Sequence, residues 1–343
     1  MSTFTNQPSV PTSSEPILVD VQDLKQHFPI RKGVLGRISD RVHAVDGVSF
    51  QIRRGETLSL VGESGCGKST VGRCLLRLNK PTAGTVSFDG QRIDNLDNAT
   101  LRPIRARIGA VFQDPFSSLN PRMRVKELIA EPIHNYGLAK DSADLDRRVA
   151  ELLDIVHLPA NAASRWPHEF SGGQRQRICI ARALAGEPDL IVCDEAVSAL
   201  DVSVKAQIVN LLQDLQARLG LALLFISHDL AIVEHLTHQV AVMYLGRIVE
   251  MGPKRLLFAA PQHPYTQALL SAVPIPDPDN SRQRIVLHGD VPSPINPPQG
   301  CHFHTRCPQA FARCRADAPL LKKLGDRHWS ACHLNEPASE EAA

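Results

Sequence analysis

A glycine-rich stretch between an apolar run and a helical pattern constrains the fold of this chain more than any other feature. Residues 62–70 read Gly-Glu-Ser-Gly-Cys-Gly-Lys-Ser-Thr and fit the pattern G-x-x-x-x-G-K-S/T. The apolar run 58–61 indicates a buried strand before it, and residues 71–78 carry apolar side chains at helical spacing after it. Strand, glycine-rich turn and helix are the context in which this pattern forms a phosphate-binding loop.

Elementary chemistry supports an anionic ligand at this stretch, which we call the phosphate loop. Glycines let the backbone approach an anion closely, and the helix that follows adds the positive end of its dipole. Lys68 can reach the β- and γ-phosphates of a nucleotide, and Ser69 can ligate Mg²⁺. The alternative is a glycine-rich turn with a surface lysine, which the flanking strand and helix disfavour. The predicted nucleotide-binding residues of the loop are Gly62, Glu63, Ser64, Gly65, Cys66, Gly67, Lys68, Ser69 and Thr70.

Composition bounds the class of protein. A chain of 343 residues is long enough for about two or three domains, and its 43% hydrophobic content allows a sizeable core. The net charge of +2 and the 5% aromatic content argue against a nucleic-acid-binding protein. No apolar run reaches the roughly 18–20 residues that a membrane span needs. Residues 1–15 lack the pattern of a secretory signal, so we expect a cytoplasmic protein with a disordered tail at 1–15.

Hydrophobic periodicity predicts a layered α/β protein. The first strands, 17–28, 48–52 and 84–88, indicate a β-rich layer beside the phosphate loop. A helical insertion is expected at about 114–185, because apolar residues there recur at helical spacing. Buried strands and helices then alternate, which argues for a parallel α/β core. The expected elements after 114 are helices at 125–133, 145–156 and 174–184, a strand at 190–193, a helix at 204–219, a strand at 221–226, a helix at 230–236 and a hairpin at 239–251.

A carboxylate pair follows one of these strands. Asp194 and Glu195 come directly after the apolar residues 190–193. Carboxylates at the end of a buried parallel strand point toward the phosphate loop in such folds. We expect Asp194 to hold Mg²⁺, directly or through water, and Glu195 to act as the general base that orients an attacking water. The alternative is a strand that ends in two solvated acids.

Other polar residues stand at element boundaries but carry little information alone. Residues 171–174, Ser-Gly-Gly-Gln, open a helix that the serine can cap, and the glycines expose N–H groups to an anion. Gln113 follows an apolar pair, and His228 follows the strand 221–226. A capped helix start is the plainer interpretation of residues 171–174, and a structural role is the plainer interpretation of His228.

Taken together, these motifs resemble a known family. The segments 62–70, 171–174 and 198–201, with Gln113, the pair at 194–195 and His228, occur in the order found in ABC-type ATPases. The resemblance covers about residues 17–254, and the Ser-Gly-Gly tripeptide separates this family from other phosphate-loop enzymes. It implies a P-loop NTPase core of ABC type at 16–260, with an antiparallel β subdomain and the helical insertion. A small Cys-rich extension, residues 261–343, follows.

Further stretches resemble the F-type ATP-binding subunit of dipeptide and oligopeptide permeases. They are residues 112–121, 198–203, 226–230, 243–247, 263–270 and 292–301. The resemblance implies a subunit that hydrolyses ATP to energise import of di- and oligopeptides. One alternative is the same role for another small solute, such as nickel or glutathione. A soluble ABC ATPase of translation or DNA repair is disfavoured, because those proteins usually carry two such domains or a long coiled-coil insertion.

The resemblance also implies roles and partners. In ABC ATPases two nucleotide-binding domains sandwich two ATP molecules, so a second domain is needed, by family pattern a homologous D-type subunit. Two integral membrane permease subunits and, indirectly, a peptide-binding protein complete the assembly at the cytoplasmic face of the inner membrane. The residues expected to serve the ATP bound here are Lys68, Ser69, Gln113, Asp194, Glu195 and His228. Among them, Gln113 is expected to sense Mg²⁺ and to link the site to the membrane subunits, and His228 to contact the γ-phosphate. Those expected to face the partner's ATP are Ser171, Gly172 and Gly173, with Gln174 beside them.

Three other positions follow from the resemblance. Phe28 is expected to stack on adenine, and a core phenylalanine is the alternative. Asp201 is expected at the dimer seam. Ala196 stands where the family usually has proline; we expect the chemistry to survive, because neither residue supplies a catalytic group.

The last 43 residues hold four of the eight cysteines, Cys301, Cys307, Cys314 and Cys332. Their spacing does not match the usual C-x2-C zinc pattern, yet four thiols in a cytoplasmic protein favour a metal over disulfides. The resemblance implies a [4Fe–4S] cluster, with zinc second and unligated thiols third. The neighbouring histidines that could substitute as ligands are His302, His304, His328 and His333.

Overall fold

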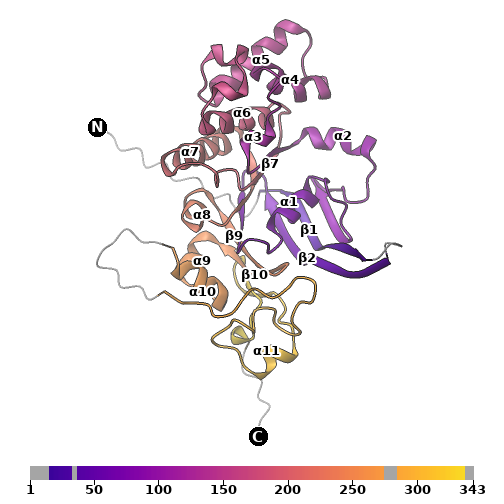
Figure 1. Cartoon of the computed structure of the whole chain (residues 1–343), viewed down its shortest axis with the longest axis vertical. Helices are drawn as coiled ribbons and strands as arrows, with labels where there is room; N and C mark the ends of the chain where they lie inside the picture. Colours follow the sequence, from indigo (N-terminus) through magenta and orange to yellow (C-terminus); the bar gives the residue numbers. More distant parts are fainter. Residues whose placement is uncertain (1–14, 33–36, 274–283, 337–343) are drawn as a thin grey trace, which may run out of the picture. The chain divides into compact units, whose positions relative to one another are not determined.

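The computed structural model describes residues 15–32, 37–273 and 284–336, so the predicted disordered tail lies outside the described residues except for Glu15 (Figure 1). The chain divides into two compact units, each built from several segments. Unit 1 contains the described residues of Met1–Val19, Ile52–Thr57 and Phe88–Ser227, and unit 2 those of Asp20–Gln51, Leu58–Ser87 and His228–Ala343. The domain intervals expected from the sequence remain a prediction.

Unit 1 contains a parallel ladder of three strands, β6 (Ile108–Val111), β7 (Leu190–Asp194) and β8 (Ala222–Ser227). Val111 pairs with Cys193, and Asp194 pairs with Ile226. All residues of β7 and β8 are buried, as their unbroken apolar sequences predict. The parallel core is therefore confirmed here, and the carboxyl ends of the three strands share one edge.

Helices fill the chain between β6 and β7. Capping explains where the main helices begin: Asp141 precedes α5 and accepts a hydrogen bond from Asp144 N, and Ser171 precedes α6. Helix α7 (Val202–Leu219) lies between β7 and β8. Two elements that periodicity did not predict, β5 (Gln91–Arg92) and α2 (Asn98–Ala106), precede β6. The helices between β6 and β7 are α3 (Pro115–Ser118), α4 (Val125–Tyr136), α5 (Ser142–Ile155), the short 3-10 turns Ala160–Ser164 and Pro167–Glu169, and α6 (Gly172–Leu184).

A ring of four charges joins separate segments of unit 1. Arg54 binds Asp89 and Asp189 at 2.8 Å each, and Arg107 binds the same two carboxylates at 2.7 and 2.6 Å. Each carboxylate accepts from both guanidinium groups, and these hydrogen bonds, those from Arg107 first, lower the pKa of Asp89. The ring ties the start of β7 to a turn about one hundred residues earlier in the chain.

Unit 2 contains a sheet with the order β3-β9-β10-β12-β11. Strand β3 (Thr57–Val61) is parallel to β9 (Gln239–Tyr244), with Val61 opposite Val242. The predicted hairpin is confirmed, because β10 (Arg247–Pro253) is antiparallel to β9. The C-terminal region then adds β12 (His328–Ser330) and β11 (Lys322–Gly325) beyond β10. These two short strands were not predicted.

The remaining elements of unit 2 are the strands of a second sheet and several short helices. Strands β1 (Ile17–Lys32), β2 (Arg37–Arg53) and β4 (Ala83–Phe88) form a second sheet with the order β2-β1-β4, and β2 buries Val48, Phe50 and Ile52 in alternation, as predicted. The helices are α1 (Lys68–Leu75), α8 (Leu230–Leu236), α9 (Lys254–Ala259), α10 (Pro264–Ser271), α11 (Ala312–Ala316) and the 3-10 turn His333–Asn335. In the described part of the chain, no helix combines the length and apolarity of a membrane span.

One buried carboxylate fastens the C-terminal region to β10. Glu250 is fully buried and accepts hydrogen bonds from the backbone N–H groups of Gln262 (2.8 Å) and His263 (2.9 Å). His328 Nε2 donates to the same carboxylate at 2.9 Å. A buried carboxylate is tolerated when several donors satisfy it. The residues after 260 therefore supply the donors that satisfy this buried carboxylate.

Candidate nucleotide site

The phosphate loop follows β3, and close backbone contacts explain two of its glycines. A Cβ at Gly62 would lie 2.2 Å from the Met243 carbonyl oxygen, and one at Gly67 would lie 2.0 Å from that of Ala44. Both glycines also have positive φ, 149° and 105°. Gly65 has open space around it, and there the φ of 80° is what favours glycine. The loop conformation is thus fixed by contacts with β9 and β2.

Lys68, the first residue of α1, lies inside the loop. Its ammonium donates to the carbonyl oxygens of Gly62 at 2.8 Å and Glu63 at 3.0 Å, and the side chain is buried. The preceding residue, Gly67, is the N-cap in left-handed conformation, and no side chain caps this helix start. The first N–H groups of α1 and the lysine therefore supply the positive groups that an anion at this end of the helix requires.

The second residue of the loop is held by the C-terminal region. Glu63 N donates to the Tyr265 hydroxyl at 2.9 Å. Arg306 donates to both Glu63 carboxylate oxygens, at 2.8 and 3.2 Å, and this hydrogen bonding raises the pKa of the guanidinium. Neither Tyr265 nor Arg306 was predicted as a site residue. The only local signals were the position of Tyr265 beside the helix start His263-Pro264 and that of Arg306 directly before Cys307.

Unit 1 holds another set of predicted site residues at the carboxyl edge of its strands. Asp194 ends β7 and is buried, and Glu195 follows it. Gln113 lies two residues beyond β6 and is exposed. His228, the first residue of the next segment of unit 2, directly follows β8 along the chain and is exposed too.

Glu195 has an unusual backbone conformation. Its φ is 50°, a left-handed value that a residue with a side chain seldom adopts. Glu195 N donates to the Ile226 carbonyl at 3.0 Å, and its own carbonyl accepts from the N–H (3.0 Å) and hydroxyl (2.8 Å) of Ser198. Such strain costs on the order of 1–3 kcal/mol and is concentrated at functional sites. Ala196, next in the chain, is buried. It stands at the position where the family usually has proline.

The Ser-Gly-Gly-Gln segment opens α6 as a capping box. The Ser171 hydroxyl accepts from Gln174 N at 3.3 Å, and the Gln174 side chain accepts from Ser171 N at 3.0 Å. A Cβ at Gly173 would lie 2.4 Å from Val204 Cγ1, so close packing against α7 requires this glycine. A Cβ at Gly172 would meet Leu200 at an ordinary 3.5 Å. Packing within unit 1 therefore requires glycine at 173 and does not require it at 172.

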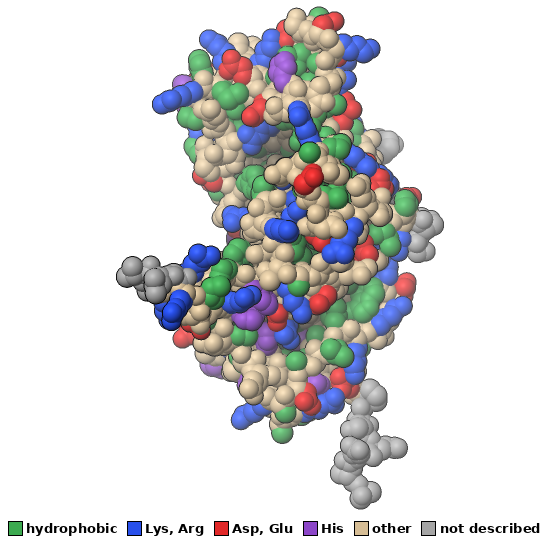
Figure 2. Space-filling view, turned by 90° about the vertical axis from the view of Figure 1, so that its right-hand side faces the viewer, with side chains coloured by type: hydrophobic (Ala, Val, Ile, Leu, Met, Phe, Trp, Pro, Cys, Tyr) green, Lys and Arg blue, Asp and Glu red, His purple; other side chains and the backbone are tan. Residues whose placement is uncertain are grey.

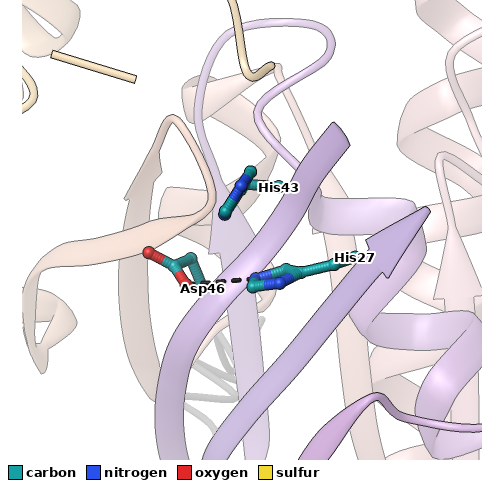
Figure 3. A group of neighbouring side chains, drawn as sticks. All are labelled: His27, His43 and Asp46. Carbon is teal, nitrogen blue, oxygen red and sulfur yellow. Dashed lines mark hydrogen bonds and ion pairs between the residues drawn. The ribbon is translucent and has the colours of Figure 1, made fainter. Parts of the chain in front are cut away.

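Phe28 belongs to β1 in unit 2 and has 38% of its surface exposed, so the core alternative for this residue is wrong. Next to it, His27 Nε2 donates to Asp46 at 3.1 Å (Figure 3). Arg247 binds the other carboxylate oxygen of Asp46 at 2.7 Å. The donor atoms of His27, His43 and Asp46 lie within 4.8 Å of one another, a spacing that a metal ion could use. The guanidinium already neutralises this carboxylate, however, so we interpret the group as an ion-pair network.

The four C-terminal cysteines line one small cavity. Burial raises the pKa of three of the thiols: Cys301, Cys307 and Cys332, the last to about 11. Of the four histidines considered as substitute ligands, two face the same cavity. His328 instead binds Glu250, and His302 Nδ1 donates to the Leu245 carbonyl at 3.4 Å. The cavity is lined by Cys301, Cys307, Cys314, Cys332, His304 and His333 among others.

The structure thus brings the predicted residues together in two sets. Unit 2 contains the phosphate loop, Phe28, His228 and the four cysteines. Unit 1 contains Gln113, the segment 171–174, Asp194 and Glu195.

Two family descriptions match this chain. Residues 45–198 match the family described as ABC transporter. Residues 249–314 match the family described as the oligopeptide/dipeptide transporter, C-terminal region. The first match contains the phosphate loop and the segment 171–174, and the second contains Tyr265 and Arg306.

Curated relatives are similar over almost the whole chain. The probable peptide ABC transporter ATP-binding protein y4tS of Sinorhizobium fredii is 54% identical over 327 residues, covering 94% of this chain and 91% of the relative. The oligopeptide transport ATP-binding protein AppF of Bacillus subtilis is 51% identical over 325 residues, covering 94% of this chain and 98% of the relative.

Solved structures agree on the fold. The dimeric ATP-binding cassette MJ0796 bound to ADP and Pi is 30% identical, with a TM-score of 0.62, and covers 69% of this chain and 99% of its own. The structure of cbiO1 from Clostridium perfringens, part of the ABC transporter complex cbiONQ, is 27% identical, with a TM-score of 0.62, and covers 72% of this chain and 92% of its own. The chain therefore belongs to the ATP-hydrolysing ABC transporter subunits that carry the oligopeptide/dipeptide transporter C-terminal region.

Proposed function

We propose that this chain binds and hydrolyses ATP to energise import of di- and oligopeptides through a membrane-embedded ABC transporter. One observation carries the proposal: a single chain joins the ABC cassette, residues 45–198, to the C-terminal region of oligopeptide and dipeptide transporters, residues 249–314. The names of the relatives, which describe peptide or oligopeptide transport, support the substrate class.

The proposed site binds nucleotide through groups from several elements. Lys68 and the N–H groups at the start of α1 bind the phosphates, and Phe28 stacks on the base. Ser69 and Asp194 would hold Mg²⁺, and Gln113 would sense it; the bound ion would neutralise part of the phosphate charge. A hydroxyl and a buried carboxylate are the oxygen ligands that this ion prefers, so the donor set fits.

Hydrolysis is proposed to depend on two further groups at the strand ends. Glu195 orients the water that attacks the γ-phosphorus, in line with the departing ADP oxygen. His228 contacts the γ-phosphate. The strained φ of Glu195 supports its assignment, because strain of this kind is maintained where a side chain must be aimed.

The site is proposed to be completed by a second ATP-binding subunit, a homologous D-type chain. Ser171, Gly172 and Gly173 face the nucleotide that this partner binds. The start of α6 supports this role, since Ser171 is exposed there and both glycines, half-buried, lie at a helix N-terminus. The ordinary packing at Gly172 supports it as well, because a contact with a partner's phosphate explains a glycine that internal packing does not require.

Membrane permease subunits are proposed to bind unit 1 near Gln113, at the cytoplasmic face of the inner membrane. A groove of about 270 Å³, which includes Phe112, Pro132 and Tyr136, lies among α2, β6, α4 and α6 and supports this placement. Gln113, next to Phe112, would link nucleotide binding to the permease, and a peptide-binding protein acts indirectly. Nucleic acid is not an expected partner, and basic and acidic side chains are interspersed on the face shown in Figure 2.

We further propose that the four C-terminal cysteines hold a [4Fe–4S] cluster, with zinc as the alternative. Four thiol side chains around one cavity are the ligand number that such clusters use, so the donor set fits. His304 and His333 line the same cavity and remain possible substitutes.

The decisive test is uptake by the assembled transporter. The chain is reconstituted in proteoliposomes with its D-type partner, the permease subunits and the peptide-binding protein, and ATP-dependent uptake of labelled di- and oligopeptides is measured. We expect peptide uptake that Lys68→Ala abolishes. Uptake of nickel or glutathione without peptide uptake would replace the substrate class and leave the ATPase role intact.

A further inference from the structure

Glu63 of the phosphate loop has its backbone and side chain held at the same time. Its N–H donates to the Tyr265 hydroxyl at 2.9 Å, and its carbonyl accepts from Lys68 Nζ at 3.0 Å. Its carboxylate accepts two hydrogen bonds from Arg306, at 2.8 and 3.2 Å. Two of these three anchors come from the C-terminal region, about two hundred residues or more further along the chain.

The two C-terminal anchors are themselves fixed by packing. The Arg306 side chain is 9% exposed, and Tyr265 is fully buried. Phe303, which is 1% exposed, packs against the rings of Tyr244 and Tyr265 with centroid distances of 5.2 and 5.3 Å. Packed side chains of this kind have few rotamers available, so they hold the groups they bind in place. The anchors are thus rigid supports of the loop.

Charge gives this arrangement a second consequence. A loop that receives the phosphates of a nucleotide is a poor place for an unpaired carboxylate, because like charges repel. Arg306 neutralises the Glu63 carboxylate through a bidentate pair, a geometry in which lysine cannot replace arginine. Loss of Arg306 would therefore have two effects. It would release the Glu63 side chain, and it would leave the negative charge of this carboxylate unneutralised beside the ligand.

We infer that Arg306 is a positioning residue for the phosphate loop, acting through Glu63, and that Tyr265 holds the backbone of the same residue. The guanidinium of Arg306 binds the Glu63 carboxylate, so it acts through the conformation and charge of the loop. The effect therefore falls on nucleotide affinity, and the step in which water attacks proceeds at a similar rate once ATP is bound. The inference rests on the proposed nucleotide site at residues 62–70.

The test measures MgADP binding to the full chain by calorimetry, because ADP binds without hydrolysis. Arg306→Gln is expected to weaken the affinity about tenfold, and Arg306→Lys less, since it keeps the charge and loses the fork. Glu63→Gln removes the negative charge that would repel the phosphates as well as the ion pair with Arg306. Its effect on MgADP affinity is therefore smaller than that of Arg306→Gln. The double variant should resemble Glu63→Gln alone, because Arg306 acts through that carboxylate.

A matched pair of tyrosines tests the backbone anchor. Tyr265→Phe removes the hydroxyl that Glu63 N uses, and we expect a several-fold loss of MgADP affinity. Tyr136→Phe is the control, because Tyr136 belongs to α4 in unit 1 and is not among the groups that hold Glu63. Thermal unfolding and metal content are recorded for every variant, so that unfolding or loss of a metal at Cys307 is recognised.

Kinetics separate positioning from a general loss of structure. In the assembled transporter, Arg306→Lys should raise the KM for ATP and change kcat by less than twofold. Unchanged MgADP affinity in both Arg306→Gln and Tyr265→Phe would overturn the inference, as would strictly additive effects in the double variant. Lys68→Ala distinguishes this failure from a failure of the proposed site, because MgADP binding that survives Lys68→Ala would reject the site itself.

Discussion

The guanidinium carbon of Arg175 lies 4.1 Å from the centre of the Phe116 ring. Arg175 belongs to α6, four residues after its serine cap, and Phe116 belongs to α3, three residues after Gln113. The contact therefore joins the segment that faces the partner's ATP, by our proposal, to the segment beside the permease groove. Arg182, further along α6, also donates to the Ser118 carbonyl of α3 at 2.7 Å.

Weakening this contact should reduce coupling more than basal hydrolysis. Phe116→Ala removes a cation–π contact worth about 0.5–1 kcal/mol at an exposed site, and we expect a two- to fivefold smaller stimulation of ATPase activity by the peptide-loaded binding protein. The measurement compares stimulated and basal rates of the assembled transporter. Leu219→Ala, another exposed apolar residue of unit 1, is the control. Equal stimulation in both variants would contradict a coupling role.

Replacement of the general base should separate binding from turnover. Glu195→Gln keeps the size of the side chain and removes its basicity, so ATP should bind while hydrolysis falls on the order of 100-fold or more. Glu187→Gln is a close control, because Glu187 is also an acid with positive φ, 55°, in unit 1. ATP binding and phosphate release are measured side by side. Hydrolysis that continues unchanged in Glu195→Gln would remove this residue from its role.

The two glycines of α6 should respond differently to a methyl group. Gly173→Ala places a Cβ 2.4 Å from Val204 Cγ1, and we expect a loss of about 1–3 kcal/mol in unfolding free energy. Val204→Ala in the same chain should restore part of it. Gly172→Ala meets only an ordinary contact, so stability should be retained while ATPase activity of the assembled transporter is lost. Urea unfolding and ATPase assays are measured for both variants. An equal loss of stability in the two variants would show that both glycines serve packing.

Protein purified without oxygen should contain iron and inorganic sulfide and absorb visible light, because four cysteines line one cavity. Cys314→Ser should lower the iron content. Cys179→Ala, a buried cysteine of α6 in unit 1, should leave it unchanged. Zinc alone, or no metal, would remove the cluster from the proposal.

Acid should destabilise the protein through His263. This side chain is buried, and loss of hydration lowers its pKa to about 3. In the unfolded chain the pKa is about 6.5, so between these values the unfolded state binds a proton that the folded state does not. Stability is therefore lost as the pH falls below about 6.5, at up to about 1.4 kcal/mol per pH unit.

His263→Asn tests this assignment. Asparagine can still accept from Tyr265 N as a helix cap, as His263 Nδ1 does at 3.1 Å, but it does not titrate. Urea midpoints at pH 7 and pH 5 should differ less in the variant than in the natural chain. An identical pH slope would show that other groups cause the acid sensitivity.

Short stretches of sequence were enough to predict some parts of the candidate site. A few neighbouring residues indicate the phosphate loop, the carboxylates after β7 and the serine cap of α6. The reasons for Gly62 and Gly67 could not be predicted, because they depend on the carbonyls of Met243 and Ala44 from other strands. The pair of Arg306 with Glu63 spans 243 residues, and no periodicity carries such information.

Short elements of the C-terminal region escaped prediction for a related reason. Strand β12 has three residues, too few for an alternating pattern, and it exists because β10 offers it an edge. Helix α10 did carry a signal, the proline at its first position after His263, a preference of helix starts. Pairing with β10 therefore determines β12, whereas the sequence around His263 could have predicted α10.

The buried Glu250 limits the positions at which this chain can be joined to a relative by natural or designed recombination. Its carboxylate binds groups at Gln262, His263 and His328, so a chain cut near residue 260 would keep the acid in β10 and lose all three donors. An unpaired buried charge costs several kcal/mol. A chimaera that exchanges C-terminal regions between relatives should therefore be joined before β10, so that the acid and its donors are inherited from one parent.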